Sequence, residues 1–388
     1  MTSLVFYKNL SENLKDKIFK ILLFIFFSVY IIKQTVFFTS QTNFINIKHL
    51  NNFLFLLDLS LIIFRFDYIL ETLKRINLKN FLLTLSSIIV SLLFFASSSV
   101  FFNDFIKIFI ILSISLSIQK DFPKCIEIIS DSICLTVLFC ICISNILGSD
   151  LLISNLNWNK TSAGFINSNL PSLFLFSSIF GYFLINKRNK LLLISIINFL
   201  LYLFFNIHSR TATLSIIIVL SGIIIKNKIF YKAINYISII LSAFYLTLFL
   251  SFGSFYDLID SNLFFNTINK ISSNRFFTLL SLDWQINTSD KIINLKNDYS
   301  IGIDSLYYEL IRYLGFISIV YLVLFFLNRY YFKSYFYRPQ FAVNVLLISG
   351  LLEGLFYKIT PMVIFLTHII LENFLINNKF FKERNDYL

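Results

Sequence analysis

Charged residues are scarce in this sequence. Asp, Glu, Lys and Arg make up only 14% of the 388 residues, whereas 57% are hydrophobic, and the mean hydropathy is +0.77. Soluble domains contain about 25% charged residues. A soluble core could not bury so much apolar surface, so the composition argues against a soluble domain and predicts that lipid surrounds most of the chain.

Cysteine and histidine are also rare, and two common motifs are missing. The sequence has no GxxxxGK[ST] phosphate loop and no dinucleotide-binding glycine pattern, which argues against a nucleotide cofactor. The four cysteines lack the paired spacing of metal ligands, and the three histidines, His49, His208 and His368, are scattered. We therefore expect no cofactor and no metal site.

The charge that is present is mostly basic, with a formal net charge of +12. The Lys and Arg residues lie in short segments between apolar runs and do not form a cluster large enough to bind a nucleic acid groove. We therefore expect no nucleic acid partner. Basic residues in short loops between apolar runs are instead typical of membrane proteins.

Apolar runs long enough to cross a bilayer recur along the whole chain. A transmembrane helix needs about 20 apolar residues. We predict twelve spans, at 18–38, 50–66, 81–101, 104–119, 126–148, 168–186, 190–207, 211–226, 233–252, 306–328, 340–357 and 360–376. The last two are short and are also compatible with a re-entrant hairpin. The expected fold class is an all-α polytopic membrane protein.

Lys and Arg alternate between the two sides of the predicted bundle. If the N-terminus is cytoplasmic, the segments expected inside carry 22 of the 33 basic residues, and the alternation holds at every turn. Cytoplasmic loops are enriched in Lys and Arg. The sequence thus predicts a multi-pass protein of the cytoplasmic (inner) membrane with both termini in the cytoplasm.

One long hydrophilic segment stands apart from the apolar runs. Residues 253–305 form a loop that the alternation places on the extracytoplasmic side, and long loops in a helical bundle are usually functional. The chain therefore divides into an N-terminal membrane bundle of about nine spans at 1–252, the loop at 253–305, and C-terminal spans with a cytoplasmic tail at 306–388. No internal repeat is present, which argues against an inverted-repeat transporter.

Charged residues within or beside the spans are the candidate functional residues, because each costs free energy in the membrane. Arg210 lies in a tight outer turn, His208-Ser209-Arg210-Thr211-Ala212. Its guanidinium is either a snorkelling interfacial cation or a group that binds a diphosphate bidentately. Arg275, in the long loop, is either an ordinary solvated charge or a group anchored at the interface by its flanking Phe pair.

The exit of the long loop carries three further charges. Asp304 begins the tenth span and is either a helix N-cap or a proton acceptor. Glu309 and Arg312 follow on one helical face, as a self-neutralising ion pair or as part of a polar cleft. The acids Asp58, Asp131 and Glu353 also fall in predicted spans and are compatible with proton relay, but they share no spacing.

Three stretches, taken in order, resemble a known family. They are TSAGFINSNLPSLFLFSSIFGYFL at 161–184, the Ser-Arg turn within 198–225, and the long loop followed by IDSLYYELIRYLGFISIVYLVLFF at 303–326. Together they resemble the O-antigen polymerases and O-antigen ligases. The three stretches extend from residue 161 to residue 326, an interval of roughly half of the chain. Their order and topology are more specific than any one motif.

The resemblance implies a function and a site. Members of the family join undecaprenyl-diphosphate-linked oligosaccharides at the outer face of the cytoplasmic membrane, so Arg210 and Arg275 are expected to bind diphosphate or sugar. Asn169 and Asp304 are expected near the acceptor pocket. The histidine that ligases carry near the loop exit is missing, since that stretch reads Asp304-Ser305-Leu306-Tyr307, and this favours a polymerase over a ligase. Ser318 and Thr211 stand where the family usually has glycine.

The resemblance implies three kinds of partner: the lipid-linked oligosaccharide, membrane lipid, and associated proteins that regulate chain length or flip the substrate across the membrane. The main alternative from another class is a flippase or transporter of lipid-linked oligosaccharides. It usually lacks one dominant outer loop and has two similar halves, and neither feature fits this sequence. A structural or sensory membrane protein is a third alternative, and it predicts no dependence of any activity on Arg210.

Overall fold

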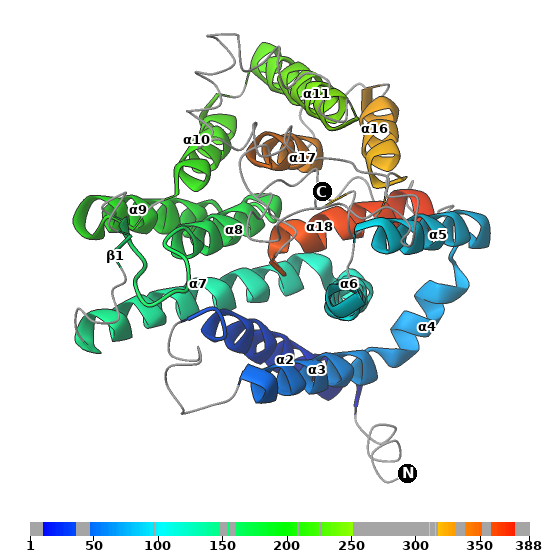
Figure 1. The fold of residues 1–388 in the computed structure, drawn as a ribbon, viewed down its shortest axis with the longest axis horizontal. Helices are drawn as coiled ribbons and strands as arrows, with labels where there is room; N and C mark the ends of the chain where they lie inside the picture. The colour runs from blue at the N-terminus through cyan, green and yellow to red at the C-terminus, as the bar shows by residue number, and fades with distance from the viewer. Residues whose placement is uncertain are drawn as a thin grey trace, which may run out of the picture. The chain divides into compact units, whose positions relative to one another are not determined.

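The computed structural model describes most of the chain (Figure 1). The described residues are 11–35, 47–95, 98–147, 154–155, 160–207, 209–225, 227–250, 310, 315, 317–330, 338–350 and 358–376.

Almost every described element is a helix. The helices are α2 (Glu12–Ile32), α3 (Ile47–Phe64), α4 (Phe66–Lys74), α5 (Leu78–Phe95), α6 (Ser98–Ile118), α7 (Phe122–Leu147), α8 (Leu170–Leu184), α9 (Arg188–Phe205), α10 (Arg210–Ile224), α11 (Lys228–Leu250), α16 (Ile317–Tyr330), α17 (Arg338–Ser349) and α18 (Pro361–Ile370). A 3-10 turn, η2 (Gln119–Asp121), joins α6 to α7, and a π-helical turn, η4 (Leu371–Leu375), extends α18. The strands β1 (Ser154–Asn155) and β2 (Lys160–Thr161) form one short antiparallel ladder. Each of the twelve apolar runs overlaps a helix, which confirms the prediction of a helical protein.

Two of the described helices are long and apolar enough to cross a membrane by length and composition. They are Phe105–Ile146, which joins most of α6 to η2 and α7, and Arg188–Phe205, which is α9. Other apolar helices are shorter, among them α8, α10 and the helix Pro361–Leu375. The helices are thus compatible with membrane insertion, and the twelve crossings stay a prediction.

The chain divides into two compact units, each assembled from segments far apart in the sequence. Unit 1 comprises Met1–Arg75, Phe109–Leu220 and Thr360–His368, and unit 2 comprises Ile76–Ile108, Ser221–Ile359 and Ile369–Leu388. The predicted division at residues 252 and 305 concerns position relative to a membrane, and it stays a prediction. The long loop at 253–305 lies outside the described residues.

In unit 1, α2 packs against α3 and α7, and α8 packs against α7 and α9 (Figure 1). Hydrogen bonds donated by hydroxyl groups of α7 show the relative directions of α2 and α7. Ser132 of α7 donates to the Phe24 carbonyl of α2 at 2.7 Å, and Thr136, one turn later, donates to Ser28, one turn later on α2. The two helices therefore run parallel, as expected of two spans that both leave the cytoplasmic side.

The neighbouring helices run antiparallel. Arg65, which follows α3, contacts Asp16 near the start of α2. In the hairpin of α8 and α9, the Ser172 hydroxyl donates to Asn198 Oδ1 at 3.2 Å, and the two residues lie at similar distances along the chain from the turn. Short connections between helices produce such antiparallel neighbours.

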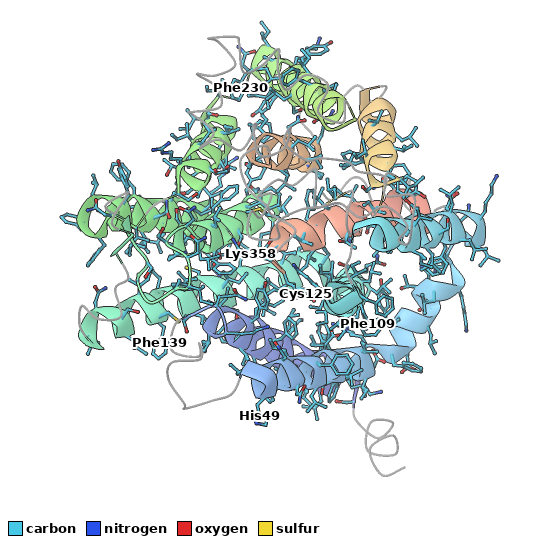
Figure 2. The ribbon with its side chains drawn as sticks, viewed as in Figure 1. His49, Phe109, Cys125, Phe139, Phe230 and Lys358 are labelled. Carbon is cyan, nitrogen blue, oxygen red and sulfur yellow. The ribbon has the colours of Figure 1, made fainter. Side chains whose placement is uncertain are left out.

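The helices of unit 1 differ in how much of their surface is covered. Every residue of α8 is buried, whereas α9 exposes Leu193, Ile196 and Phe199, each 56% exposed. On α7, Phe139 is exposed and Cys125 is buried, and Figure 2 labels both. Exposed apolar faces of this size suit contact with lipid, because water would disfavour them.

Unit 2 is held together by polar contacts between its helices as well as by apolar packing. Ser238 of α11 donates to Asn344 Oδ1 of α17 at 2.6 Å. The Tyr321 ring of α16 stacks on Phe374 with ring centroids 4.5 Å apart, and its hydroxyl lies 3.0 Å from Thr84 Oγ1 of α5. Tyr321 therefore links three segments that are far apart in the sequence.

Candidate functional site

Arg210 is the first residue of α10, and its side chain is exposed. The preceding residue, Ser209, is buried and acts as the N-cap. Its hydroxyl accepts from the Ala212 N–H at 3.4 Å, and its carbonyl accepts from the Thr213 N–H at 2.9 Å. Ser is favoured at this position because its oxygen satisfies an N–H that lacks a helical partner. The cap fixes where α10 begins and presents the Arg210 guanidinium at the helix end.

Asn169 is the N-cap residue of α8 and is partly buried. Its own N–H donates to Asn167 Oδ1 at 2.9 Å, so the two asparagines form a tight turn before the helix. The Asn169 side chain does not cap the helix. Pro171, at the second helical position, suits the first turn because no helical partner exists there for its missing N–H.

The α8–α9 hairpin places these two predicted residues at one end of unit 1. The three-residue turn Ile185–Lys187 reverses the chain from α8 to α9, so the end of α9 returns to the start of α8, and α10 begins a few residues after α9 ends. Asn206 takes a left-handed conformation with φ of 51°, which ends α9 as a C-cap asparagine commonly does. The starts of α8 and α10, with Asn169 and Arg210, therefore lie at the same end.

The segment before α8 is anchored to the end of α2. The Ile166 N–H donates to the Gln34 carbonyl at 3.1 Å, and Thr35 pairs with Phe165. The Ser144 hydroxyl of α7 donates to the Ala163 carbonyl at 2.9 Å. The C-terminal ends of α2 and α7 thus meet the start of α8, and we call this end of unit 1 the outer end, after its predicted position.

Ion pairs gather at the opposite end of unit 1. The Lys20 Nζ atom lies 2.7 Å from Asp16 Oδ2 and 3.1 Å from Asp121 Oδ2. The Arg65 guanidinium also contacts Asp16, and it lies over the Phe19 ring. These residues come from the start of α2, the end of α3 and η2. The alternation of basic residues predicts that this end of unit 1 lies on the cytoplasmic side.

The ion pairs determine how Asp16 titrates. Burial alone would raise the pKa of the Asp16 carboxyl, but the hydrogen bond from Lys20 and the positive charge of Arg65 outweigh it, so the pKa lies below the ordinary value of 3.8. Asp16 therefore contributes to stability in its ionised form.

A second group of charges joins α7 to the start of α9. Lys190 lies 2.9 Å from Glu127 and 2.8 Å from Asp131, and the Tyr182 hydroxyl of α8 donates to Asp131 at 2.7 Å. Asp131 is one of the three acids in predicted spans that are compatible with proton relay. Because Lys190 and Tyr182 contact its carboxylate, a structural ion pair is the better interpretation.

Asp58 is the second of those acids, and it is fully buried. The Ser113 hydroxyl lies 2.7 Å from its Oδ1 atom. Among the described residues, no hydrogen-bond partner contacts its Oδ2 atom. The third acid, Glu353, lies outside the described residues.

The other predicted site residues, Arg275, Asp304, Glu309 and Arg312, also lie outside the described residues, and their roles stay predictions. In the described part of the chain, no group of three or more His, Cys, Asp or Glu side chains is arranged to hold a metal ion. The sequence patterns did not predict the ion-pair clusters, whose paired members lie up to 101 residues apart, as with Lys20 and Asp121.

No protein-family model matches the sequence, and searches of curated proteins and of solved structures give no match. The resemblance to the O-antigen polymerases therefore depends on the three stretches, their order and the predicted topology.

Proposed function

We propose that the protein polymerises undecaprenyl-diphosphate-linked oligosaccharide repeat units into O-antigen or capsular polysaccharide at the outer face of the cytoplasmic membrane. The observation that carries this proposal is the Ser209-Arg210 turn. It presents an exposed guanidinium at the start of α10, at the same end of unit 1 as Asn169.

A lipid-diphosphate substrate needs a cation at the membrane boundary. A lipid diphosphate keeps its prenyl tail in the bilayer and its phosphates at the boundary, with the sugars outside. A guanidinium binds phosphate oxygens through two parallel hydrogen bonds, and the positive end of a helix dipole at its N-terminus also favours an anion. Arg210 combines both at the start of α10.

The reaction needs little else from the protein. The anomeric bond to undecaprenyl diphosphate breaks as an acceptor hydroxyl attacks, and the departing diphosphate drives the transfer without a nucleotide. We expect Arg275 to bind diphosphate or sugar from the long loop, and Glu309 and Arg312 to line a polar cleft. Asp304 is the expected acceptor of the hydroxyl proton.

Helix directions in unit 1 support the twelve-span topology on which the proposal depends. The parallel pair α2 and α7 and the antiparallel pair α8 and α9 are those that a chain crossing the membrane alternately would give. In this arrangement Arg210 and Asn169 face the extracytoplasmic side, and the cluster around Asp16 and Lys20 faces the cytoplasm.

The test is complementation of a strain from which the gene has been deleted. Arg210→Ala should reduce the surface glycan to single repeat units, and Arg210→Lys should restore only part of the polymer, because an ammonium cannot form the bidentate contact. Arg188→Ala is the matched control, since Arg188 is also exposed and also begins a helix, α9, but lies at the opposite end. Membrane levels of each variant are measured by immunoblot.

The outcome also separates the alternatives. Polymer of normal length in Arg210→Ala cells would contradict the proposed role of Arg210. Loss of all repeat units from the surface of the deletion strain would indicate a flippase. Polymer that stays on undecaprenyl diphosphate and is not transferred to its final acceptor would indicate a ligase.

A further inference from the structure

Lys33 is a half-buried cation at the C-cap of α2. Neither a carboxylate nor a hydrogen-bond acceptor within the described residues contacts its ammonium group. It differs in this from Lys20 on the same helix, which lies between Asp16 and Asp121 at 2.7 Å and 3.1 Å. One helix thus carries a neutralised lysine at one end and a lysine without a described counter-charge at the other.

The chain around Lys33 is held firmly in place. The next residue, Gln34, accepts the Ile166 N–H through its carbonyl at 3.1 Å, and Thr35 is fully buried and pairs with Phe165. The Thr35 hydroxyl also donates to the Ile32 carbonyl at 2.6 Å. Lys33 therefore projects from an ordered turn rather than from a free end.

This turn docks on the segment that leads into Asn169. Ile166, bonded to Gln34, is followed directly by Asn167, which accepts the Asn169 N–H at 2.9 Å. The first helix of unit 1 therefore contributes a cation beside the start of α8, at the outer end where α10 presents Arg210.

Placing an ammonium here has a cost that a bound anion would offset. The negative end of the α2 dipole offsets only part of the cost of a partly desolvated ammonium, and the positive-inside rule disfavours Lys at the outer side of a membrane. The ordinary explanation is that the lysine stem covers apolar surface while the ammonium reaches the headgroup region. That explanation predicts no ligand.

We propose that Lys33 is a second phosphate-binding cation at the outer end of unit 1, and that its ligand is a lipid phosphate at the membrane boundary. This inference depends on the proposed function for the identity of that lipid as undecaprenyl diphosphate. The same chemistry also fits the phosphate of an anionic phospholipid headgroup. Lys33 and Arg210 then bind the polar head of the lipid from two helices that are distant in sequence.

Binding of defined lipids to the purified full-length protein in nanodiscs tests the proposal. The probes are undecaprenyl diphosphate, undecaprenol, which lacks phosphate, and phosphatidylglycerol, each measured in neutral phosphatidylcholine discs. Lys33→Gln should weaken binding of undecaprenyl diphosphate about tenfold, the size expected for one charge-assisted hydrogen bond, and should leave undecaprenol unchanged. Lys33→Arg should keep most of the affinity.

Lys17→Gln is the matched control, because Lys17 is on the same helix and is exposed near the opposite end. Equal binding of undecaprenyl diphosphate by wild type and Lys33→Gln would overturn the subsite and leave the proposed function standing. Failure of the wild type to prefer undecaprenyl diphosphate over undecaprenol, with a Lys33-dependent preference for phosphatidylglycerol, would support the subsite as a headgroup site and contradict the proposed function. Absence of any Lys33-dependent preference would overturn the subsite.

Discussion

Among the glycines that the structure describes, Gly315 should tolerate substitution least. It lies just before α16 with φ of 76°, in the left-handed region that residues with a Cβ atom rarely adopt. A Cβ atom built there would lie 2.6 Å from the Ser87 carbonyl oxygen and 2.8 Å from the Ser87 carbonyl carbon, both backbone atoms of α5. Backbone atoms cannot rotate away, so α5 and the start of α16 would have to separate.

The loss of stability in Gly315→Ala has two causes, the left-handed backbone conformation and the contact with the Ser87 backbone. The left-handed conformation costs about 1–2 kcal/mol for alanine, and forcing a packed contact apart costs about 1–3 kcal/mol. Together they predict that Gly315→Ala lowers the free energy of unfolding by about 2–5 kcal/mol. For a chain of this length, that corresponds to an unfolding temperature lower by about 3–6 °C.

The measurement is thermal unfolding of the purified protein in one detergent at one scan rate, because unfolding of large proteins is often irreversible. Gly181→Ala is the control. Its new Cβ would meet the side-chain oxygen of Ser130 on α7, so Ser130→Ala should relieve the contact. Ser87→Ala leaves the Ser87 backbone in place and should not rescue Gly315→Ala. Unfolding of Gly315→Ala at the wild-type temperature, or recovery of that temperature on adding Ser87→Ala, would contradict the backbone contact as the cause.

Three further predictions concern charge and topology. Because the folded pKa of Asp16 lies below 3.8, its ionised form adds stability above that pH and this stability is lost as the pH falls further. The difference in unfolding temperature between wild type and Asp16→Asn should therefore be constant above about pH 5 and should shrink below the ordinary Asp pKa; a difference that persists unchanged in acid would contradict this. In a cysteine-free background, a cysteine at Ser261 should react with an impermeant reagent in intact cells and one at Asn189 should not, and the reverse result would invert the topology. Asp304→Asn should reduce polymer length at matched protein levels if the carboxylate takes a proton, whereas wild-type polymer would leave Asp304 as a helix cap, since Asn caps as well as Asp.

The positions of the helices could be predicted from the sequence because an apolar run is a local signal. The run at 126–148 corresponds to α7 (Phe122–Leu147), and the run at 190–207 to α9 (Arg188–Phe205). The signal failed for α4 (Phe66–Lys74), in a stretch expected to be a cytoplasmic loop. That helix buries only Ile69 and Thr72, so its apolar side is too narrow to appear as a run.

The polar contacts could not be predicted, because they depend on which helices become neighbours. In the sequence Asp131 is an acid within an apolar run, and nothing local indicates that α8 and α9 place Tyr182 and Lys190 against it. Of the site residues, the position of Arg210 at a helix start follows from the capping preference of Ser209, which is local. The docking of Lys33 beside the start of α8 involves residues more than a hundred positions apart and leaves no local pattern.

Because α8 is completely buried, it should not tolerate the insertion or deletion of a residue. Adding one residue to a helix turns everything after it by about 100°. In α9, such a rotation would replace one apolar side chain by another over much of the exposed helix surface. In α8 it would move Gly181 away from Ser130 and Tyr182 away from Asp131 at once. Insertions and deletions should therefore be tolerated in the connections on either side of α8 and not within the helix.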